Sequence, residues 1–485
     1  MENRIDNNRV KISNVNDVDI TLFANEEVFI DSQSIDEIKK FTSITNTIEE
    51  LKHKDYLPKD AKVERMVLTP DFHRGTGIPV GTVIKGQKFI MPKAIGNDIG
   101  CGMRFLTTDI TYDEYLSLGK KLDDKLRYIF FEGGRHIPLS YNQRYAMFTN
   151  GISGLLEEKH SDDGIWKYWN QNQQEYDMKR THKNGSFKSS DVYNLEEFMV
   201  GSGKEYTYDD QVGTIGGGNH FVEIQRTSNI SDFYHSKEWN INSENINIMV
   251  HTGSASIGHI VGKHFIDKAK QDYPLGIPHP YKDFFMLNTE SELGIKYISA
   301  MNNAANFAFV NRLFLGLMTV RAFSELLGRE VEAKLVYDSP HNLIWEEDNS
   351  IVHRKGSCPA YGQTDDIFNT GHPVIIPGSM GANSFILRGN GLEDSLKSAC
   401  HGAGRKYARK TGHAKKNPNI SNLRVVTKID PLRTRSDILK ECMKSLMEEA
   451  PDMYKDCTPV IDTVTSSGIA DVVATVEPLL TIKGI

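Results

Sequence analysis

The 485-residue chain has few cysteines, no long apolar run and no excess of positive charge. Its 5 cysteines are odd in number and scattered, which excludes a disulfide framework and favours a reducing compartment. No stretch approaches the ~20 apolar residues that span a bilayer. The first residues also lack the apolar segment of a secretory signal, so we expect a cytoplasmic protein without a membrane partner. The formal net charge of -7 excludes a globally basic nucleic-acid-binding coat, but it is compatible with a local basic site.

The composition and the pattern of segments predict an α+β fold. Hydrophobic residues make up 39% of the chain and charged residues 25%, as in folded globular proteins. Strand-like and helix-like segments mix without a regular βα repeat. A helix is predicted from about 294 to 327, where small and apolar residues recur at helical spacing and Gly328 follows as a stop. The polar segment 160–191 has few aliphatic residues, and we interpret it as an insertion or mobile segment, with an ordinary solvated loop as the simpler alternative.

Five potential metal ligands stand beside glycine-rich turns and strand-like runs. Asp98 and Cys101 lie three residues apart in GNDIGCG, and we expect His220, His251 and His341 each to lie just beyond a strand. Any one of them would more often be an ordinary polar residue. Together they could hold two ions with Cys101 as a bridging thiolate. Mixed oxygen, nitrogen and sulfur ligands suit Mn, Zn, Co or Fe better than Mg or Ca.

The segment SACHGAGRKYARKTGHAKK combines a histidine, a turn of small residues and the most basic stretch of the chain. His401 could receive a phosphate whose oxygens are held by the N–H groups of 402–404. The basic residues, which include Arg405 and Arg409, are suited to a polyanion. The alternative is a solvated basic helix face.

Two further segments indicate a phosphate site. GSMGANS, 378–384, is interpreted as a second phosphate loop in which the hydroxyls of Ser379 and Ser384 donate, with a plain loop as the alternative. Lys483 follows the apolar run TVEPLLTI, so we expect the tail to pack into the body of the protein.

Taken in order, these motifs resemble the RtcB-type RNA ligases, which are GTP-dependent enzymes of tRNA splicing and RNA repair. The resemblance runs from PDFHRGTGIPVG at Pro70 to the final KGI. It includes PKAIGNDIGCGM, GTIGGGNHFVE, HTGS, AMNNAANFAFVNR, SPHN, VHRKG, PGSMG, HGAGR, APDMYKD and LLTIKG. Each string is moderately specific, and the whole series in this order is very specific. The resemblance implies a single large catalytic domain, 1–485, with mixed β-sheets and surrounding helices.

The resemblance also implies roles for individual residues. His401 matches the histidine that becomes guanylylated, and Asp71 is expected to orient it. The ligands of two manganese ions match Asp98, Cys101, His220, His251 and His341, with Cys101 bridging. The guanylate-binding segments match Asn219, His220, Glu223, His341, Asn342, Pro377, Gly378, Ser379, Met380, Ser384, His401, Gly402, Ala403, Gly404, Tyr454 and Lys483. The expected RNA contacts are Lys355, Arg405 and Arg409.

In this family the histidine attacks the α-phosphate of GTP, and the guanylate then passes to an RNA 3′-phosphate. A 2′,3′-cyclic phosphate is first opened by hydrolysis. An RNA 5′-hydroxyl finally attacks the activated end and GMP leaves. The expected substrates are therefore GTP and RNA with 3′-phosphate or 2′,3′-cyclic phosphate ends and 5′-hydroxyl ends, with two Mn²⁺ per chain. An archease-like activator is the protein partner that the resemblance suggests.

Two features depart from the family pattern. The loop HTGSASIG has Ala255 where the family usually has the arginine of HSGSRG, which predicts the loss of one RNA or phosphate contact. The segment from about 136 to 208 also matches poorly. Two alternatives stay open: a dinuclear metal-dependent phosphatase or nuclease, and a GTP-binding paralogue that does not ligate. GTP consumption without RNA separates ligase from hydrolase, because a ligase should stop near one pyrophosphate per enzyme.

Overall fold

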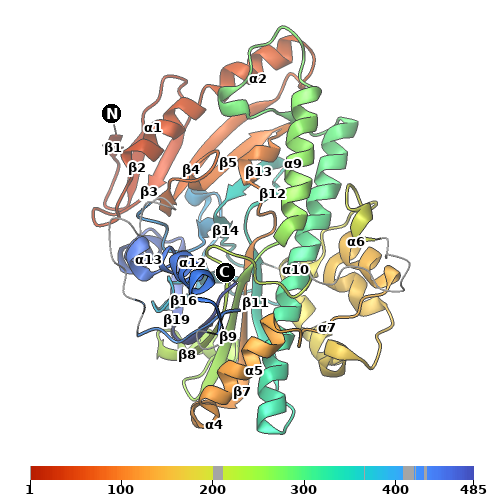
Figure 1. The fold of residues 1–485 in the computed structure, drawn as a ribbon. Helices are drawn as coiled ribbons and strands as arrows, with labels where there is room; N and C mark the ends of the chain where they lie inside the picture. The colour runs from red at the N-terminus through yellow and green to blue at the C-terminus, as the bar shows by residue number, and fades with distance from the viewer. Residues whose placement is uncertain are drawn as a thin grey trace.

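The computed structural model describes residues 2–199, 211–364, 366–407, 420, 422–430 and 434–484. Two large β-sheets with helices around them make an α+β fold, which confirms the predicted class (Figure 1). The helices are α1 (Ser32–Phe41), α2 (Ile44–His53), α3 (Pro92–Ile95), α4 (Tyr112–Leu118), α5 (Lys120–Phe131), α6 (Tyr141–Glu157), α7 (Gln171–Lys179), α8 (Phe233–Glu238), α9 (Ala255–Gln271), α10 (Glu292–Leu327), α12 (Ser436–Met447) and α13 (Cys457–Ser466).

The first sheet has the strand order β1-β2-β3-β4-β5-β13-β12. Its strands are β1 (Glu2–Arg4), β2 (Arg9–Ile12), β3 (Ile20–Phe23), β4 (Lys62–His73), β5 (Val80–Gln87), β12 (Leu343–Glu347) and β13 (Ser350–Lys355). The pair β3–β4 is parallel, and α1 and α2 supply the crossover that a parallel pair requires. The last eight residues of β4 are all buried, so this strand carries its polar end into the interior.

The second sheet has the order β11-β7-β9-β8-β19-β16-β15, with β18 beside β19. Its strands are β7 (Gly102–Thr111), β8 (Phe221–Ile230), β9 (Asn245–Thr252), β11 (Ala333–Pro340), β15 (Pro373–Ile376), β16 (Ser384–Gly389), β18 (Val425–Val426) and β19 (Ala470–Ile482). The edge strands β11 and β15 also contact each other, so the sheet is nearly closed. Two small sheets pair β6 (Phe89–Ile90) with β10 (Leu287–Asn288), and β14 (Ser357–Pro359) with β17 (Ser398–Cys400).

The helix α10 confirms the predicted helix. Ser291 caps its start by accepting a hydrogen bond from the backbone N–H of Gly294, and Gly328 ends it with a φ of 66°. By length and composition α10 could cross a membrane, but 89% of its most apolar window is buried inside the protein. It packs against α5, α6 and α9 and against β9, so its apolar side chains form part of the hydrophobic core.

The segment 160–191 is folded, and the alternative interpretation as an ordinary solvated loop is wrong. It contains α7 and two short 3₁₀ helices, 164–168 and 182–185. Trp166 is buried, donates from Nε1 to the carbonyl of Pro138 (2.7 Å) and meets the ring of Phe314 in α10 edge-on. Aromatic and amide side chains build this small core, which explains why a search for aliphatic periodicity missed it. That the segment is an insertion or a mobile segment stays a prediction.

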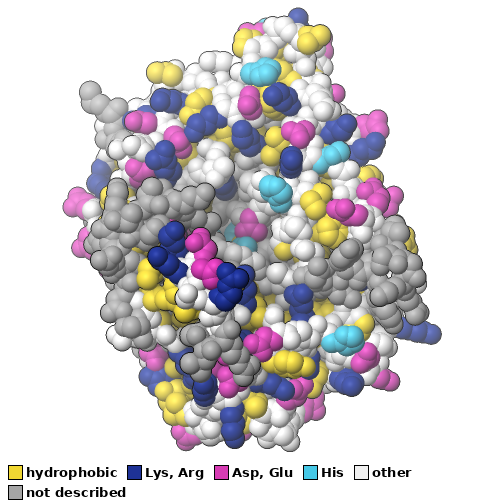
Figure 2. Space-filling model, viewed as in Figure 1, with side chains coloured by type: hydrophobic (Ala, Val, Ile, Leu, Met, Phe, Trp, Pro, Cys, Tyr) yellow, Lys and Arg dark blue, Asp and Glu magenta, His cyan; other side chains and the backbone are white. Residues whose placement is uncertain are grey.

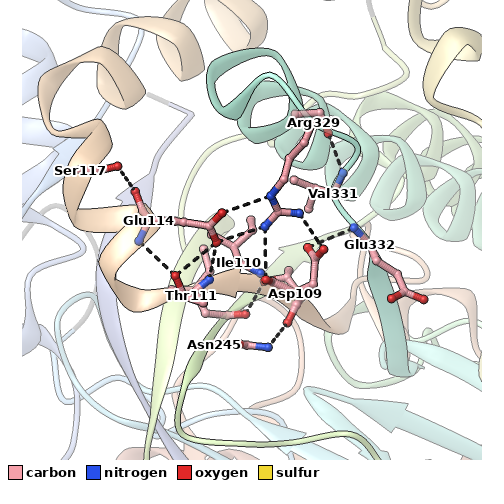
Figure 3. A network of polar contacts seen from close by, with 12 residues as sticks. Asp109, Ile110, Thr111, Glu114, Ser117, Asn245, Arg329, Val331 and Glu332 are labelled. Carbon is pink, nitrogen blue, oxygen red and sulfur yellow. Dashed lines mark hydrogen bonds and ion pairs between the residues drawn. The ribbon is translucent and has the colours of Figure 1, made fainter.

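A network of hydrogen bonds and ion pairs connects the C-terminal end of α10 to β7 and α4 (Figure 3). Arg329 donates from Nη1 to Asp109 Oδ2 (2.7 Å) and from Nε to Glu114 Oε1 (3.1 Å). Glu114 also completes the capping box at Thr111, the N-cap of α4. These side chains are about one-third exposed, so each ion pair contributes little to stability while fixing the position of the helix end.

Candidate functional site

Segments at the ends of strands from both large sheets line a cavity of about 1120 Å³. On the face drawn in Figure 2, a hollow near the centre contains histidine and acidic side chains. The cavity is lined by many of the predicted site residues, namely Asp98, Cys101, Asn219, His251, His341, Asn342, Lys355, Pro377, Gly378, Ser379, Met380, His401, Gly402, Ala403, Gly404, Arg405, Tyr454 and Lys483. Four others are buried or nearly buried behind its wall: Asp71, His220, Glu223 and Ser384. Arg409 lies outside the described residues.

The predicted metal ligands converge into two triads that share Cys101. One contains Cys101, His251 and His341, and the other contains Asp98, Cys101 and His220; within each, the candidate ligand atoms lie within 4.8 Å of one another. Cys101 Sγ is 3.2 Å from His220 Nε2 and 3.4 Å from His251 Nε2. Such an arrangement can hold a pair of metal ions with a bridging sulfur.

Strand pairing brings these residues together. Cys101 directly precedes β7, and His251 in β9 pairs with Met103 of β7. His341 follows β11, and its backbone N–H donates to the carbonyl of Cys101 (2.5 Å). The expected placement beyond a strand is thus confirmed for His341. It is wrong for His251, which lies within β9 because that strand continues to Thr252. It is also wrong for His220, because β8 begins only after this residue, at Phe221.

Burial sets the charge state of this cluster. It lowers the pKa of His251 and of His341 well below the ordinary value, so both imidazoles are neutral and able to ligate. Burial would raise the pKa of Asp98, but His220 at 2.9 Å keeps it below its ordinary value. Burial, together with the Asp98 carboxylate, raises the pKa of the Cys101 thiol. A bound cation reverses that effect, because it favours the thiolate.

His401 stands beside the metal cluster and is held by a buried carboxylate. It follows β17, and its ring centroid is 4.8 Å from that of His341. His401 Nδ1 lies 2.8 Å from Asp71 Oδ2, and Thr69 Oγ1 donates to the other carboxylate oxygen (2.6 Å). Burial opposes ionisation of Asp71, but the contact with His401 keeps its pKa below the ordinary value. Since a carboxylate only accepts, Nδ1 carries the proton of the neutral imidazole, and Nε2 then keeps a free lone pair.

The glycine-rich loops are fixed by buried contacts. Ser384 accepts a hydrogen bond from the N–H of Gly378 (3.0 Å), so its hydroxyl holds the loop from behind. Gly404 has a φ of +80°, and a Cβ there would lie 2.2 Å from the carbonyl oxygen of Asp71. Lys483 donates from Nζ to the carbonyl of His220 (2.9 Å), which confirms that the tail packs into the body.

Two of the expected RNA contacts hold the walls of the cavity. Lys355 is buried, and its Nζ donates to two carbonyls of the loop 76–78; burial lowers its pKa to about 8. The guanidinium of Arg405 pairs with Glu448 and Glu449 and lies 5.2 Å from the ring centroid of Tyr454. Their roles toward RNA stay predictions, as does the effect of Ala255.

The sequence did not reveal a buried charge cluster behind the metal ligands. Asp338 Oδ1 is 2.9 Å from Arg312 Nε, and its Oδ2 is 3.3 Å from Arg104 Nη1. Arg104 also pairs with Asp177 of α7 (3.2 Å). All four side chains are at most 4% exposed. The one signal in the sequence is Arg312 within an otherwise apolar helix.

This charge cluster directly supports segments that carry candidate metal ligands. Arg312 Nη1 donates to the carbonyl of Gly100 (2.8 Å) and to that of Thr252 (2.9 Å). These two residues are the immediate neighbours of Cys101 and His251. A single guanidinium therefore ties together two of the segments that carry candidate ligands.

Comparison with known proteins agrees with the geometry of the site. The family model for the tRNA-splicing ligase RtcB matches residues 56–484. The tRNA-splicing ligase RtcB of Thermococcus kodakarensis is 29% identical over 483 residues, covering 94% of each chain. That of Nanoarchaeum equitans is 31% identical over 464 residues, covering 90% of this chain and 91% of the relative. RNA-splicing ligase RtcB homolog 1 of Entamoeba dispar is 32% identical over 443 residues, covering 86% and 78%.

Proposed function

Because the chain belongs to the RtcB family of tRNA-splicing RNA ligases, we propose that it joins RNA ends through a guanylate carried on His401. The ends to be joined are a 3′-phosphate or 2′,3′-cyclic phosphate and a 5′-hydroxyl. The observation that carries this proposal is the contact between His401 Nδ1 and Asp71 Oδ2, which in the neutral imidazole leaves the lone pair of Nε2 free beside the candidate metal ligands. The proposal includes a cytoplasmic location and an archease-like activator.

The ligand cluster is chemically suited to two transition-metal ions, for which we propose manganese. Neutral imidazoles, a carboxylate and a thiol that a cation would ionise form a donor set for such ions. His341 Nδ1 is buried and has no hydrogen-bond partner within the described part of the chain, so its lone pair is available to a metal. When bound, the ions would neutralise charge on the attacked phosphate.

In the first step His401 Nε2 forms a bond to the α-phosphorus of GTP while the bond to the bridging oxygen of the β-phosphate breaks. Pyrophosphate leaves with that electron pair. The Nδ1–H bond to Asp71 holds the ring in the reactive tautomer, and the carboxylate offsets the positive charge that the ring gains. Residues 379–380 and 402–404 line the cavity, and we propose that their backbone N–H groups hold phosphate oxygens and that Tyr454 packs against guanine.

In the later steps the guanylate passes from His401 to the RNA 3′-phosphate, which breaks the N–P bond and frees the imidazole. The RNA 5′-hydroxyl then attacks the activated phosphate, forms the phosphodiester and releases GMP. A 2′,3′-cyclic phosphate consumes one water before it enters this sequence. Lys355, Arg405 and Arg409 are proposed to support the RNA backbone through their positive charge.

The test is to incubate the protein with manganese and GTP labelled at the α-phosphate, and to look for label on the denatured chain. Acid-labile, alkali-stable label that disappears in His401→Ala supports the proposal. Pyrophosphate release without RNA should stop near one per chain. Continued GTP turnover would favour a hydrolase instead. No label on the metal-loaded wild-type chain, with ATP also tried, would overturn the proposal.

A further inference from the structure

A second cavity, of about 930 Å³, lies between the segment 167–177, the second half of α10 and the strands β7 and β11. We call it the α7–α10 cavity. None of the described residues lines both it and the cavity of His401. Its volume is in the range of small-molecule sites. Nothing in the proposed ligase reaction requires an opening at this place.

Two buried side chains of the α7–α10 cavity each have a polar atom without a hydrogen-bond partner in the described part of the chain. They are Nε of Arg104, a donor, and Oε1 of Gln174, an acceptor. Arg104 is 1% exposed and Gln174 4% exposed, so bulk water does not satisfy them. Buried polar atoms are nearly always paired in proteins. A ligand that offers one acceptor and one donor would satisfy both.

Gly316 of α10 leaves room beside this donor. A Cβ at Gly316 would lie 3.9 Å from Arg104 Nε and 3.4 Å from Leu106 Cδ1, which are ordinary contact distances. A methyl group therefore fits between the helix and the guanidinium. Glycine also costs helix stability relative to alanine, and Gly316 does not have the positive φ that would demand glycine.

The charges around the α7–α10 cavity favour an uncharged ligand. Arg104 already shares the buried charge cluster, in which two arginines face two aspartates. The wall has three cationic side chains and four carboxylates, which are Arg104, Lys167, Arg329, Asp177, Glu325, Glu330 and Glu332. An additional anion such as phosphate would find no excess of positive charge here.

The remaining wall favours a flat ring. Leu106, Leu317 and Val320 give an apolar side, and Tyr168 and Trp169 add aromatic surface. The complementary ligand has apolar faces and carries both an acceptor and a donor, as nucleobases do. We infer that the α7–α10 cavity binds an uncharged nucleobase, either from an unpaired nucleotide of RNA or from a free nucleoside. The choice of a nucleobase rests on the proposed function.

The first test uses the full chain with excess unlabelled GTP, which is meant to fill the other cavity. Equilibrium dialysis measures the binding of labelled adenosine, guanosine, cytidine and uridine. We expect one of them to bind at about one per chain. Gln174→Leu removes the acceptor at similar volume, and Gly316→Ala fills the space beside Arg104. Each should weaken binding about tenfold, as expected for one lost hydrogen bond.

Controls separate binding from folding. Asn172→Ala alters an exposed residue of α7 that does not line the cavity, and it should bind like the wild type. Gly316→Ala should keep or raise the melting temperature, because alanine favours the helix. The inference is overturned if no nucleoside binds at millimolar concentration, or if Gln174→Leu and Gly316→Ala both bind as the wild type does.

A second arm identifies the source of the base. An RNA oligonucleotide containing 4-thiouridine is irradiated with the protein, and crosslinked peptides are mapped. Crosslinks in 167–177 that a free nucleoside competes away indicate a base of RNA; nucleoside binding without such crosslinks indicates a free nucleoside. Labelling of His401 is measured in parallel. If GTP labels His401 but no nucleoside binds, only this inference is refuted. If a nucleoside binds but GTP does not label His401, only the ligase proposal is refuted.

Discussion

Replacement of Asp338 by asparagine tests whether the buried charge cluster holds the segments that carry the candidate metal ligands. The carboxylate of Asp338 is fully buried and contacts Arg312 and Arg104. Asp338→Asn keeps the size of the side chain but leaves one uncompensated positive charge in the interior. Breaking a buried ion pair in this way costs about 3–5 kcal/mol of unfolding free energy. That is a large part of the ~5–15 kcal/mol by which proteins are stable.

The same substitution should weaken metal binding. Arg312 fixes the carbonyls next to Cys101 and His251, and its own position depends on Asp338. Loss of a residue that orients metal ligands typically costs about 10–100-fold in affinity. We therefore expect Asp338→Asn to lower Mn²⁺ affinity by that factor, measured by the electron paramagnetic resonance signal of free Mn²⁺. Urea unfolding of the metal-free protein gives the stability.

Two further variants make the experiment decisive. Combining Asp338→Asn with Arg312→Met leaves the Arg104–Asp177 pair in charge balance, so part of the lost stability should return while metal affinity stays low. Asp109→Asn removes a carboxylate from the partly exposed Arg329 network and should cost less than about 1 kcal/mol. If Asp338→Asn resembled Asp109→Asn in urea and bound Mn²⁺ like the wild type, the reasoning would be refuted.

Three other predictions follow from the site. Asp71→Asn should slow labelling of the chain by GTP at least ~100-fold without unfolding it, since the amide cannot hold the same tautomer of His401; an unchanged initial rate contradicts this. Gly404→Ala should abolish labelling and lower the melting temperature, because its Cβ would clash with Asp71 at a φ of +80°; normal labelling and melting would contradict the clash. Burial raises the pKa of Glu223 from 4.5 to about 7, so the stability it contributes when protonated is lost as the pH rises through 7. Relative to Glu223→Gln, the metal-free wild type should therefore lose about 3 kcal/mol of unfolding free energy between pH 4.5 and pH 8, and parallel pH profiles in urea would rule this out.

The candidate metal ligands were accessible to sequence reasoning because each lies in a short motif close to a strand end. Cys101, His220 and His341 flank strands, so strand pairing alone brings them near one another. The α10 helix was equally accessible, since its spacing and its stop at Gly328 are local features. Patterns of this kind depend only on residues close together in the sequence, so they can be recognised without knowing the tertiary contacts.

Other features depend on contacts between distant segments. Arg104 pairs with Asp177, which is 73 positions away in the sequence, and with Asp338, which is 234 positions away. No local sequence pattern predicts either pairing. Ser384 and Glu223 are buried and do not line the cavity, which depends on the exact phase of β16 and β8. The folded state of 160–191 was hidden because aromatic and amide side chains form its core.

The position of β19 has a consequence for synthesis on the ribosome. It is the last of the described strands in the chain, yet it lies between β8 and β16 inside the second sheet. In the nascent chain β8 can pair with β9 early, but its other edge has no partner until more than two hundred further residues have emerged. This unpaired strand edge is exposed to chaperones or to other chains. Lys483, directly after β19, reaches the cavity only then. The cavity of His401 is therefore assembled late, and an incomplete chain on the ribosome would lack it.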